Sequence, residues 1–259
     1  MNIRLVACLL TSFLAACGGG GDGGAQGRMQ GTSPVIADIS LLFMGNSHTT
    51  VNDLSGMVTE MVRTGRPDKT VGAAVAPGFL FLDERLHDAA STNLLASQHW
   101  SFVILQAQKY SSSGQFTYST AEAEELIRRA RTAGAVPILF PEWPRRNIVE
   151  TQRIYDLHVS IAQREPACVA PIGQAWDLAL ARHPELTLHA DDGNHSAPAG
   201  AFLAALVLYA TITDRSPLDL PHFPRFPVDA GTQALLRAIA DEAVRMIPPH
   251  QWCAADSFA

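Results

Sequence analysis

The chain has 259 residues and a formal net charge of −6. That length suits one sizeable domain and is short for two. Lysine and arginine are not clustered, and aromatic residues do not alternate with basic ones. The sequence therefore disfavours nucleic-acid binding.

The N-terminal segment resembles an export signal. Residues 1–16 carry one positive charge, Arg4, and an apolar core that ends in a Leu-Ala-Ala run directly before Cys17. Such a core is too short to span a membrane, and small residues before a cysteine are typical of the bacterial lipoprotein signal peptide. We expect cleavage before Cys17 and lipidation of that cysteine. An ordinary signal peptide with an incidental cysteine is the alternative.

Residues 17–36 predict a glycine-rich tether between the lipid and a single domain at 37–259. Beyond the signal, no segment approaches roughly 20 unbroken apolar residues, so we expect no second membrane anchor. The predicted location is the bacterial cell envelope, with the outer membrane as the expected site, on its periplasmic side or at the surface.

Two cysteines remain in the predicted domain, Cys168 and Cys253, because Cys8 leaves with the signal and Cys17 carries lipid. In an oxidising compartment an even pair favours a disulfide between the C-terminal tail and a core strand. Two buried thiols are the alternative.

Short apolar runs alternate with longer amphipathic ones along the domain. This alternation predicts parallel strands joined by helical crossovers, in a three-layer α/β/α, flavodoxin-like arrangement with a mostly parallel five-stranded sheet. The predicted strands are Leu41–Met44, Thr70–Val75, Phe102–Gln106, Val136–Phe140 and Cys168–Ile172. The predicted helices are Asp53–Thr64, Leu82–Leu95, Ala121–Ala133, Ile148–Arg164, Gly173–Arg182, Ala199–Ile212 and Thr232–Met246.

The first strand is followed by Gly45-Asn46-Ser47-His48. A glycine permits a sharp turn, and a helix that begins at the serine points backbone N–H groups toward whatever the serine attacks. A turn followed by a helix N-cap is the alternative. Gly78 follows the second strand, and Gln106 ends the third. All three positions are therefore predicted at one edge of the sheet.

A second polar turn, Asp192-Gly193-Asn194-His195, precedes the helix at Ala199–Ile212. A carboxylate three residues before a histidine can bind its Nδ1, which leaves Nε2 free to accept a proton from a serine. An Asx-turn with an exposed histidine is the alternative.

Four blocks follow one another along the chain: Gly45-Asn46-Ser47-His48, Pro77-Gly78, Leu105-Gln106 and Asp192-Gly193-Asn194-His195. In this order they resemble the blocks of the SGNH (GDSL-type) hydrolases, and the likeness is closest to the branch with a Gly-Asn-Ser-His opening. The resemblance covers about residues 41–212, and it implies an SGNH-type hydrolase domain at 37–259. It implies Ser47 as nucleophile, His195 as general base and Asp192 as the residue that orients the histidine.

The resemblance also implies an oxyanion hole from the backbone N–H groups of Ser47 and Gly78 and a side-chain amide. The third block departs from the common Gly-x-Asn-Asp form, because the chain has Leu105-Gln106-Ala107-Gln108. Gln106 carries the same amide on one more methylene group and is the expected donor, with Gln108 as the competitor.

Three further features remain open. Trp143, at the end of the fourth strand, is a candidate substrate-binding residue or a core residue. His48 is a neighbour of the site or a solvated first-turn residue. A metal site formed by His189, Asp191, Asp192 and His195 is a minor alternative, and we expect no metal and no organic cofactor.

Together the residues predict a serine esterase that acts on a small ester or an acylated glycan, as a carbohydrate O-deacetylase would, through an acyl-enzyme. A non-catalytic envelope binding lipoprotein with the same fold and an acyltransferase are the alternatives. The oligomeric state is open.

Overall fold

The computed structural model describes residues 35–255 and residue 257. The chain divides into two units, Met1–Thr32 and Ser33–Ala259, and all the described residues belong to the second. The predicted signal peptide at 1–16, the lipidation site Cys17 and the tether up to residue 34 lie outside the described residues.

The sheet has five parallel strands in the order β2-β1-β3-β4-β5. This is the predicted flavodoxin-like order, in which the crossovers place helices on both faces. The carboxyl ends of β1, β2 and β3 meet at one edge, where the candidate site residues follow. The strands are β1 Ile39–Met44, β2 Val71–Val75, β3 Phe102–Gln106, β4 Val136–Phe140 and β5 Cys168–Val169.

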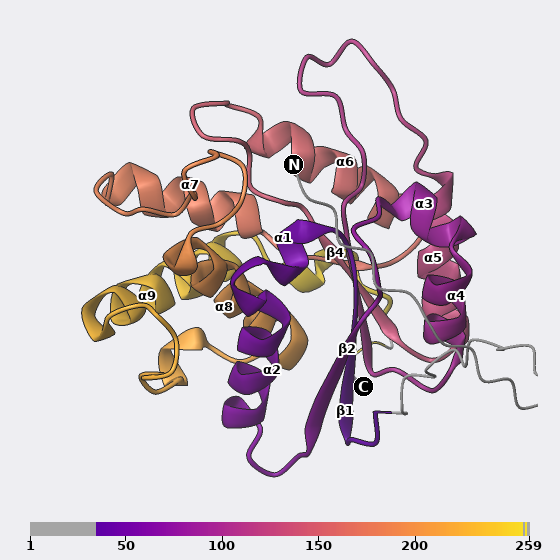
Figure 1. Cartoon of the computed structure of the whole chain (residues 1–259), viewed down its shortest axis with the longest axis horizontal. Coiled ribbons are helices and arrows are strands. Elements are labelled where there is room, and N and C mark those ends of the chain that lie inside the picture. Colours follow the sequence, from indigo (N-terminus) through magenta and orange to yellow (C-terminus); the bar gives the residue numbers. More distant parts are fainter. Residues whose placement is uncertain (1–34, 256, 258–259) are drawn as a thin grey trace, which may run out of the picture. The chain divides into compact units, whose positions relative to one another are not determined.

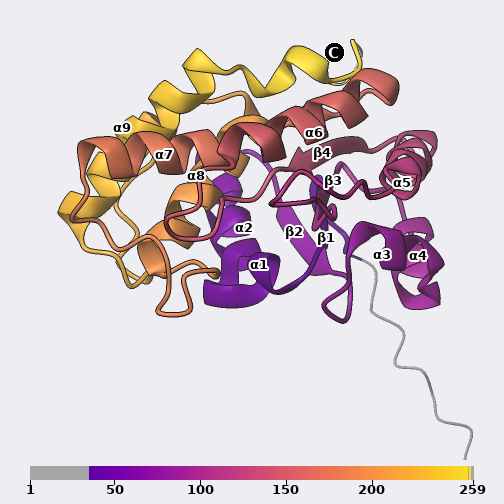
Figure 2. The same cartoon turned by 90° about the horizontal axis from the view of Figure 1, so that it is seen from above.

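Two helical layers cover the sheet (Figures 1 and 2). The alternating side chains of each strand face one layer or the other. Leu41 and Phe43 face the layer that contains α8, while Leu42 and Met44 face the layer that contains α5. The first layer has α2 Leu54–Gly65, α7 Ile172–Arg182, α8 Pro198–Thr213 and α9 Ala230–Met246. The second has α3 Leu82–His87, α4 Ala89–Ala96, α5 Ala121–Thr132 and α6 Thr151–Arg164.

The predicted helix at Leu82–Leu95 is two helices, because Asp88 has an extended backbone and its side chain caps α4 by accepting a hydrogen bond from Ser91 N at 2.8 Å. Asp and Ser at such a spacing favour a helix start over a helix interior. The last strand is also shorter than predicted, since Ile172 already begins α7.

Helix α8 is apolar on all sides, and the helices α2, α7 and α9 pack against it. Within residues 35–255, no helix combines the length and the apolar character that crossing a membrane requires.

Cys168 and Cys253 form a disulfide. It joins the buried strand β5 to the turn after Pro249–Trp252, where Trp252 O also accepts a hydrogen bond from Ala167 N at 3.0 Å. The pairing is one of the two outcomes that the sequence left open, and it fits an oxidising compartment.

Because the disulfide closes a loop of 85 residues, the double variant Cys168→Ala/Cys253→Ala should lose about 2–4 kcal/mol of unfolding free energy. Urea denaturation of both proteins, with and without a reducing thiol, measures this loss. The thiol should destabilise the wild type and leave the variant unchanged. Equal urea midpoints for wild type and variant would refute the expected contribution.

Candidate active site

Ser47 is the first residue of the short helix α1, Ser47–Thr50, directly after the turn that ends β1. The N–H of a first helical residue has no partner within its helix. Asn46 caps this helix by accepting a hydrogen bond from His48 N at 3.0 Å. Gly45 is required by a close approach, since a Cβ there would lie 2.5 Å from Gln106 Oε1. The local sequence therefore presents the Ser47 hydroxyl at the edge of the sheet.

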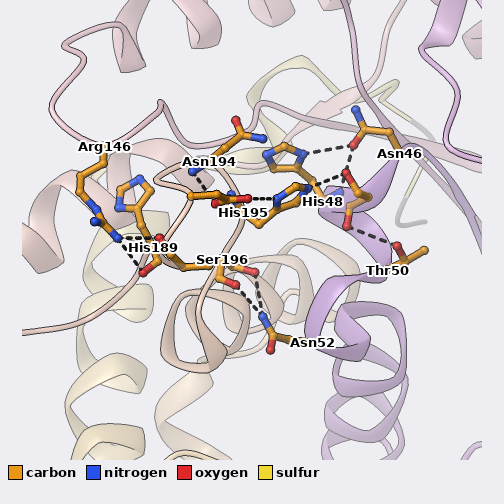
Figure 3. A network of polar contacts seen from close by, with 12 residues as sticks. Asn46, His48, Thr50, Asn52, Arg146, His189, Asn194, His195 and Ser196 are labelled. Atoms are coloured by element: carbon orange, nitrogen blue, oxygen red, sulfur yellow. Dashed lines mark hydrogen bonds and ion pairs between the residues drawn. The ribbon is translucent and has the colours of Figure 1, made fainter.

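Ser47, His195 and Asp192 form one hydrogen-bonded line. The Ser47 hydroxyl donates to His195 Nε2 at 2.8 Å, and His195 Nδ1 donates to Asp192 Oδ2 at 2.5 Å (Figure 3). The second carboxylate oxygen of Asp192 accepts from the backbone N–H groups of Asn194 and His195, each at 2.9 Å. The bonds from His195 and from these N–H groups hold the pKa of Asp192 well below its usual range.

The loop that carries Asp192 and His195 is fixed from both sides. Arg146 donates to the carbonyls of His189 and Ala190, at 3.2 and 2.6 Å, and Gly193 adopts a positive φ of 66° beside it. On the other side, Asn52 Nδ2 donates to Ser196 O at 2.7 Å (Figure 3). Asn52 lies between α1 and α2 with φ of 57°, so it ties the serine segment to the histidine loop.

Trp143, which the sequence left open as a substrate-binding or a core residue, lies in the core. Its side chain is 2% exposed and stacks on Trp176 with ring centroids 4.3 Å apart. Its Nε1 donates to Asn194 O at 3.0 Å. A ring that is buried on both faces cannot receive a substrate, so Trp143 supports the histidine loop from below.

His48 belongs to the same cluster and is not a solvated first-turn residue. It is 5% exposed, and its ring centroid lies 5.1 Å from that of Trp143 and 5.2 Å from that of His195. Burial, together with the neighbouring His195, lowers the pKa of His48 to about 4. A neutral His48 therefore packs behind His195 without adding charge.

The Ser47–His195 pair opens into a cleft of about 590 Å³. Aromatic and charged side chains line it, including Phe81, Tyr118, Arg145 and Glu142. A larger cleft of about 660 Å³ lies between α2 and the segment Phe223–Pro227 and contains none of the predicted site residues. The Ser47 hydroxyl therefore faces a space that a small molecule can enter.

No protein-family model and no curated protein sequence matches the chain. Among solved structures, a candidate SGNH hydrolase from Slackia heliotrinireducens is 26% identical, with a TM-score of 0.54 over 66% of this chain and 97% of the other. A DUF4886 family protein from Bacteroides uniformis is 16% identical, with a TM-score of 0.64 over 82% and 96%. The psychrotrophic esterase EstA from Pseudoalteromonas, inhibited by monoethylphosphonate, is 13% identical, with a TM-score of 0.50 over 68% and 98%.

This is the SGNH hydrolase fold. In this fold the structure places Gly78 after β2 with a φ of 76°, a backbone conformation that favours glycine. Its carbonyl accepts a hydrogen bond from the buried Arg85 at 2.8 Å, which fixes the turn.

Gln106, the third oxyanion donor that the sequence resemblance implied, is fully buried and does not line the cleft. Its Oε1 accepts from Asn46 N at 2.8 Å, and its Nε2 donates to Glu142 Oε2 at 2.6 Å. Gln108, the competitor, donates through Nε2 to the carbonyls of Lys109 and Ser119, at 3.0 and 2.9 Å. The longer Gln106 side chain reaches past the serine turn and braces it, so both amides already have partners.

The Glu142 carboxyl accepts the hydrogen bond from the Gln106 side-chain amide. Burial raises the pKa of its carboxyl to about 7, and although the Gln106 bond opposes this change, the nearby Glu150 adds to it. The folded state therefore keeps a proton that the unfolded state releases above its ordinary pKa of 4.5. Stability contributed by this group is lost as pH rises from about 4.5 to about 7.

The variant Glu142→Gln keeps an acceptor for Gln106 and removes this ionisation. We expect the unfolding free energy of Glu142→Gln minus that of wild type to increase by about 1–3 kcal/mol when the pH is raised from 4 to 8. Denaturant unfolding at both pH values measures the difference, with the exposed Glu185→Gln as the control. A difference between wild type and Glu142→Gln that does not change with pH would contradict the assignment.

Within the part of the chain that the structure describes, no group of three or more His, Cys, Asp or Glu side chains is arranged to hold a metal ion. His189, one of the candidate ligands, instead donates through Nε2 to Pro144 O at 2.9 Å and meets Trp176 edge-on.

Three residues that support the site were not found as such from the sequence, Asn52, Arg85 and Glu142, and His48 was one of two alternatives left open. Asn52 and Arg85 act through backbone carbonyls, which leave no pattern in a sequence. His48 and Glu142 stand next to predicted site residues, and this adjacency was the available indication.

Proposed function

We propose that the protein is a serine ester hydrolase in which Ser47 attacks the ester carbonyl and forms an acyl-enzyme. The observation that carries the proposal is the line of hydrogen bonds from Ser47 Oγ through His195 to Asp192, open to the cleft. A serine hydroxyl is a weak nucleophile until a neighbouring base removes its proton. The SGNH hydrolase fold of the chain supports the same chemistry.

In the first half-reaction, His195 Nε2 accepts the Ser47 proton while Oγ bonds to the carbonyl carbon. The carbonyl oxygen becomes an oxyanion near the N–H groups of Ser47 and Gly78, and its collapse expels the alcohol, which takes the proton from His195. Water then repeats the sequence with His195 as base and releases the acid. Asp192 keeps the His195 proton on Nδ1 and stabilises the imidazolium.

The substrate that we propose is a small ester or an acylated glycan. The 590 Å³ cleft suits a group of limited size, and aromatic side chains such as Phe81 and Tyr118 offer faces on which a sugar ring can pack. The predicted signal and Cys17 support a lipid-anchored location in the cell envelope, and the Cys168–Cys253 disulfide fits that location.

Labelling with a fluorophosphonate probe tests the function, because the probe reacts with an activated serine. We expect wild type to be labelled and Ser47→Ala to remain unlabelled, with hydrolysis of p-nitrophenyl acetate lost in parallel. Equally poor labelling of both proteins, with a glycan still bound, would favour the non-catalytic binding protein. Release of the acyl group to an added alcohol rather than to water would favour the acyltransferase.

A further inference from the structure

Arg85, on helix α3, is a fully buried cation that the proposed mechanism does not yet use. Its side chain is 0% exposed. Buried arginines normally pair with a carboxylate, but among the described residues Arg85 has no direct ion pair: Asp83 and Glu84 pair with Lys109, and Asp88 reaches Arg85 only through the Ser91 hydroxyl. Its guanidinium donates instead to Ser91 Oγ at 2.8 Å and to backbone carbonyls on two separate turns.

The two turns are those that carry the backbone donors of the proposed oxyanion hole. Nη2 donates to the carbonyl of Gly45, two residues before Ser47, through a short hydrogen bond, and to the carbonyl of Gly78 at 2.8 Å. Nη1 donates to the carbonyl of Pro77 at 2.6 Å. One rigid, planar group therefore sets the spacing between the ends of β1 and β2, which lysine with its single ammonium group cannot reproduce.

The hydrogen bond from Arg85 to the Pro77 carbonyl also acts on the Gly78 N–H. The Pro77 carbonyl and the Gly78 N–H belong to the same peptide group. A charged donor on the carbonyl polarises that peptide and makes its N–H a stronger donor. The positive charge lies on the side of the peptide opposite to this N–H, so its potential favours a negative charge in front of Gly78.

Burial of a charge without a directly bonded carboxylate is costly, and the hydrogen bonds to carbonyls and the nearby Asp88 and Glu84 offset only part of that cost. Neutral side chains can also join two turns by hydrogen bonds. The Arg85 charge differs from such neutral groups in that it lies behind both turns and can act on the peptide groups that carry the proposed oxyanion donors.

We propose that Arg85 is a positioning residue for the oxyanion hole, which holds the Ser47 and Gly78 turns at a fixed spacing and strengthens the Gly78 N–H as a donor. The inference rests on the proposed function. Because the negative charge exists only in the transition state, Arg85 should affect kcat and leave KM nearly unchanged.

The test compares Arg85→Lys and Arg85→Met with wild type by kcat and KM on p-nitrophenyl acetate and by the rate of fluorophosphonate labelling. We expect Arg85→Met to lower kcat and the labelling rate by about 30- to 100-fold with KM within about threefold of wild type. Arg85→Lys should recover part of kcat, because it restores the charge without the fork. Added guanidinium ion should raise kcat of Arg85→Met and have no effect on wild type.

Arg237→Met is the matched control, because this half-buried arginine also donates to a backbone carbonyl, that of Pro221 at 2.8 Å, away from the cleft. Its kcat should equal that of wild type. If Arg85→Met does not fold, Arg85→Lys carries the test alone, with a reduced kcat at unchanged KM as the supporting result. A folded Arg85 variant with wild-type kcat and labelling rate, or with a loss only in KM, would overturn the proposal. Absence of labelling in wild type would instead refute the proposed function.

Discussion

Replacing His195 by alanine should lower kcat about as much as replacing Ser47, by about 10⁴- to 10⁶-fold, and the double variant should be no slower than either single variant. The reason is the single hydrogen bond of 2.8 Å between Ser47 Oγ and His195 Nε2. Without the imidazole the hydroxyl keeps its proton, and without the hydroxyl the imidazole has nothing to activate. Each substitution therefore removes the same catalytic step, and the two losses of kcat do not add.

Steady-state kinetics on p-nitrophenyl acetate with the four proteins of this double-mutant cycle measures the effect. His222→Ala is the control, because His222 is exposed and does not line the cleft. The double variant should retain slow hydrolysis above the rate in water, since the backbone donors remain. Additive losses in the cycle would mean that Ser47 and His195 act separately, and the proposed acyl-enzyme route would then fail.

The architecture could be predicted because hydrophobic patterning carries it. Runs such as Val103 to Leu105 are buried on both faces of the sheet, and the lengths between the runs leave room only for helical crossovers. The position of Ser47, Asp192 and His195 at strand ends and turns followed from the same pattern. The split of the predicted helix at Asp88 was missed because one capping side chain outweighed the helical periodicity around it.

The side-chain contacts that support the site could not be predicted, because they depend on the direction in which each side chain points. Gln106 has the right chemistry for an oxyanion donor, but its extra methylene carries the amide to Asn46 N and Glu142. Trp143 stands at the expected edge of the sheet, yet it turns inward onto Trp176. Arg85 lies in a charged helix that reads as solvated, and its binding of the Gly45 and Pro77 carbonyls exists only in three dimensions.

Asp192→Asn should lower kcat by about 10²- to 10⁴-fold while it leaves the His195 loop in place. The Asn oxygen can still accept from the N–H groups of Asn194 and His195, as Asp192 Oδ1 does at 2.9 Å. The amide NH₂ then faces His195 Nδ1, where the carboxylate accepted a proton at 2.5 Å. The imidazole must turn its lone pair toward that amide and carry its proton on Nε2, which can no longer act as a base for Ser47.

The lower end of this range is expected because the Asp192 side chain is 50% exposed, and water screens the charge it provides to the imidazolium. Asp191→Asn removes the neighbouring charge without a contact to His195 and is the matched control, so its kcat should stay at the wild-type value.

Comparison of Asp192→Ala with Asp192→Asn separates the two roles of the carboxylate. Alanine leaves the His195 tautomer free but gives up both backbone bonds, whereas asparagine keeps those bonds and imposes the wrong tautomer. A lower kcat in Asp192→Asn than in Asp192→Ala would assign the effect to the tautomer. The reverse order would assign it to the shape of the loop, and then Asp192 would act on His195 as Trp143 and Arg146 do, by holding its backbone.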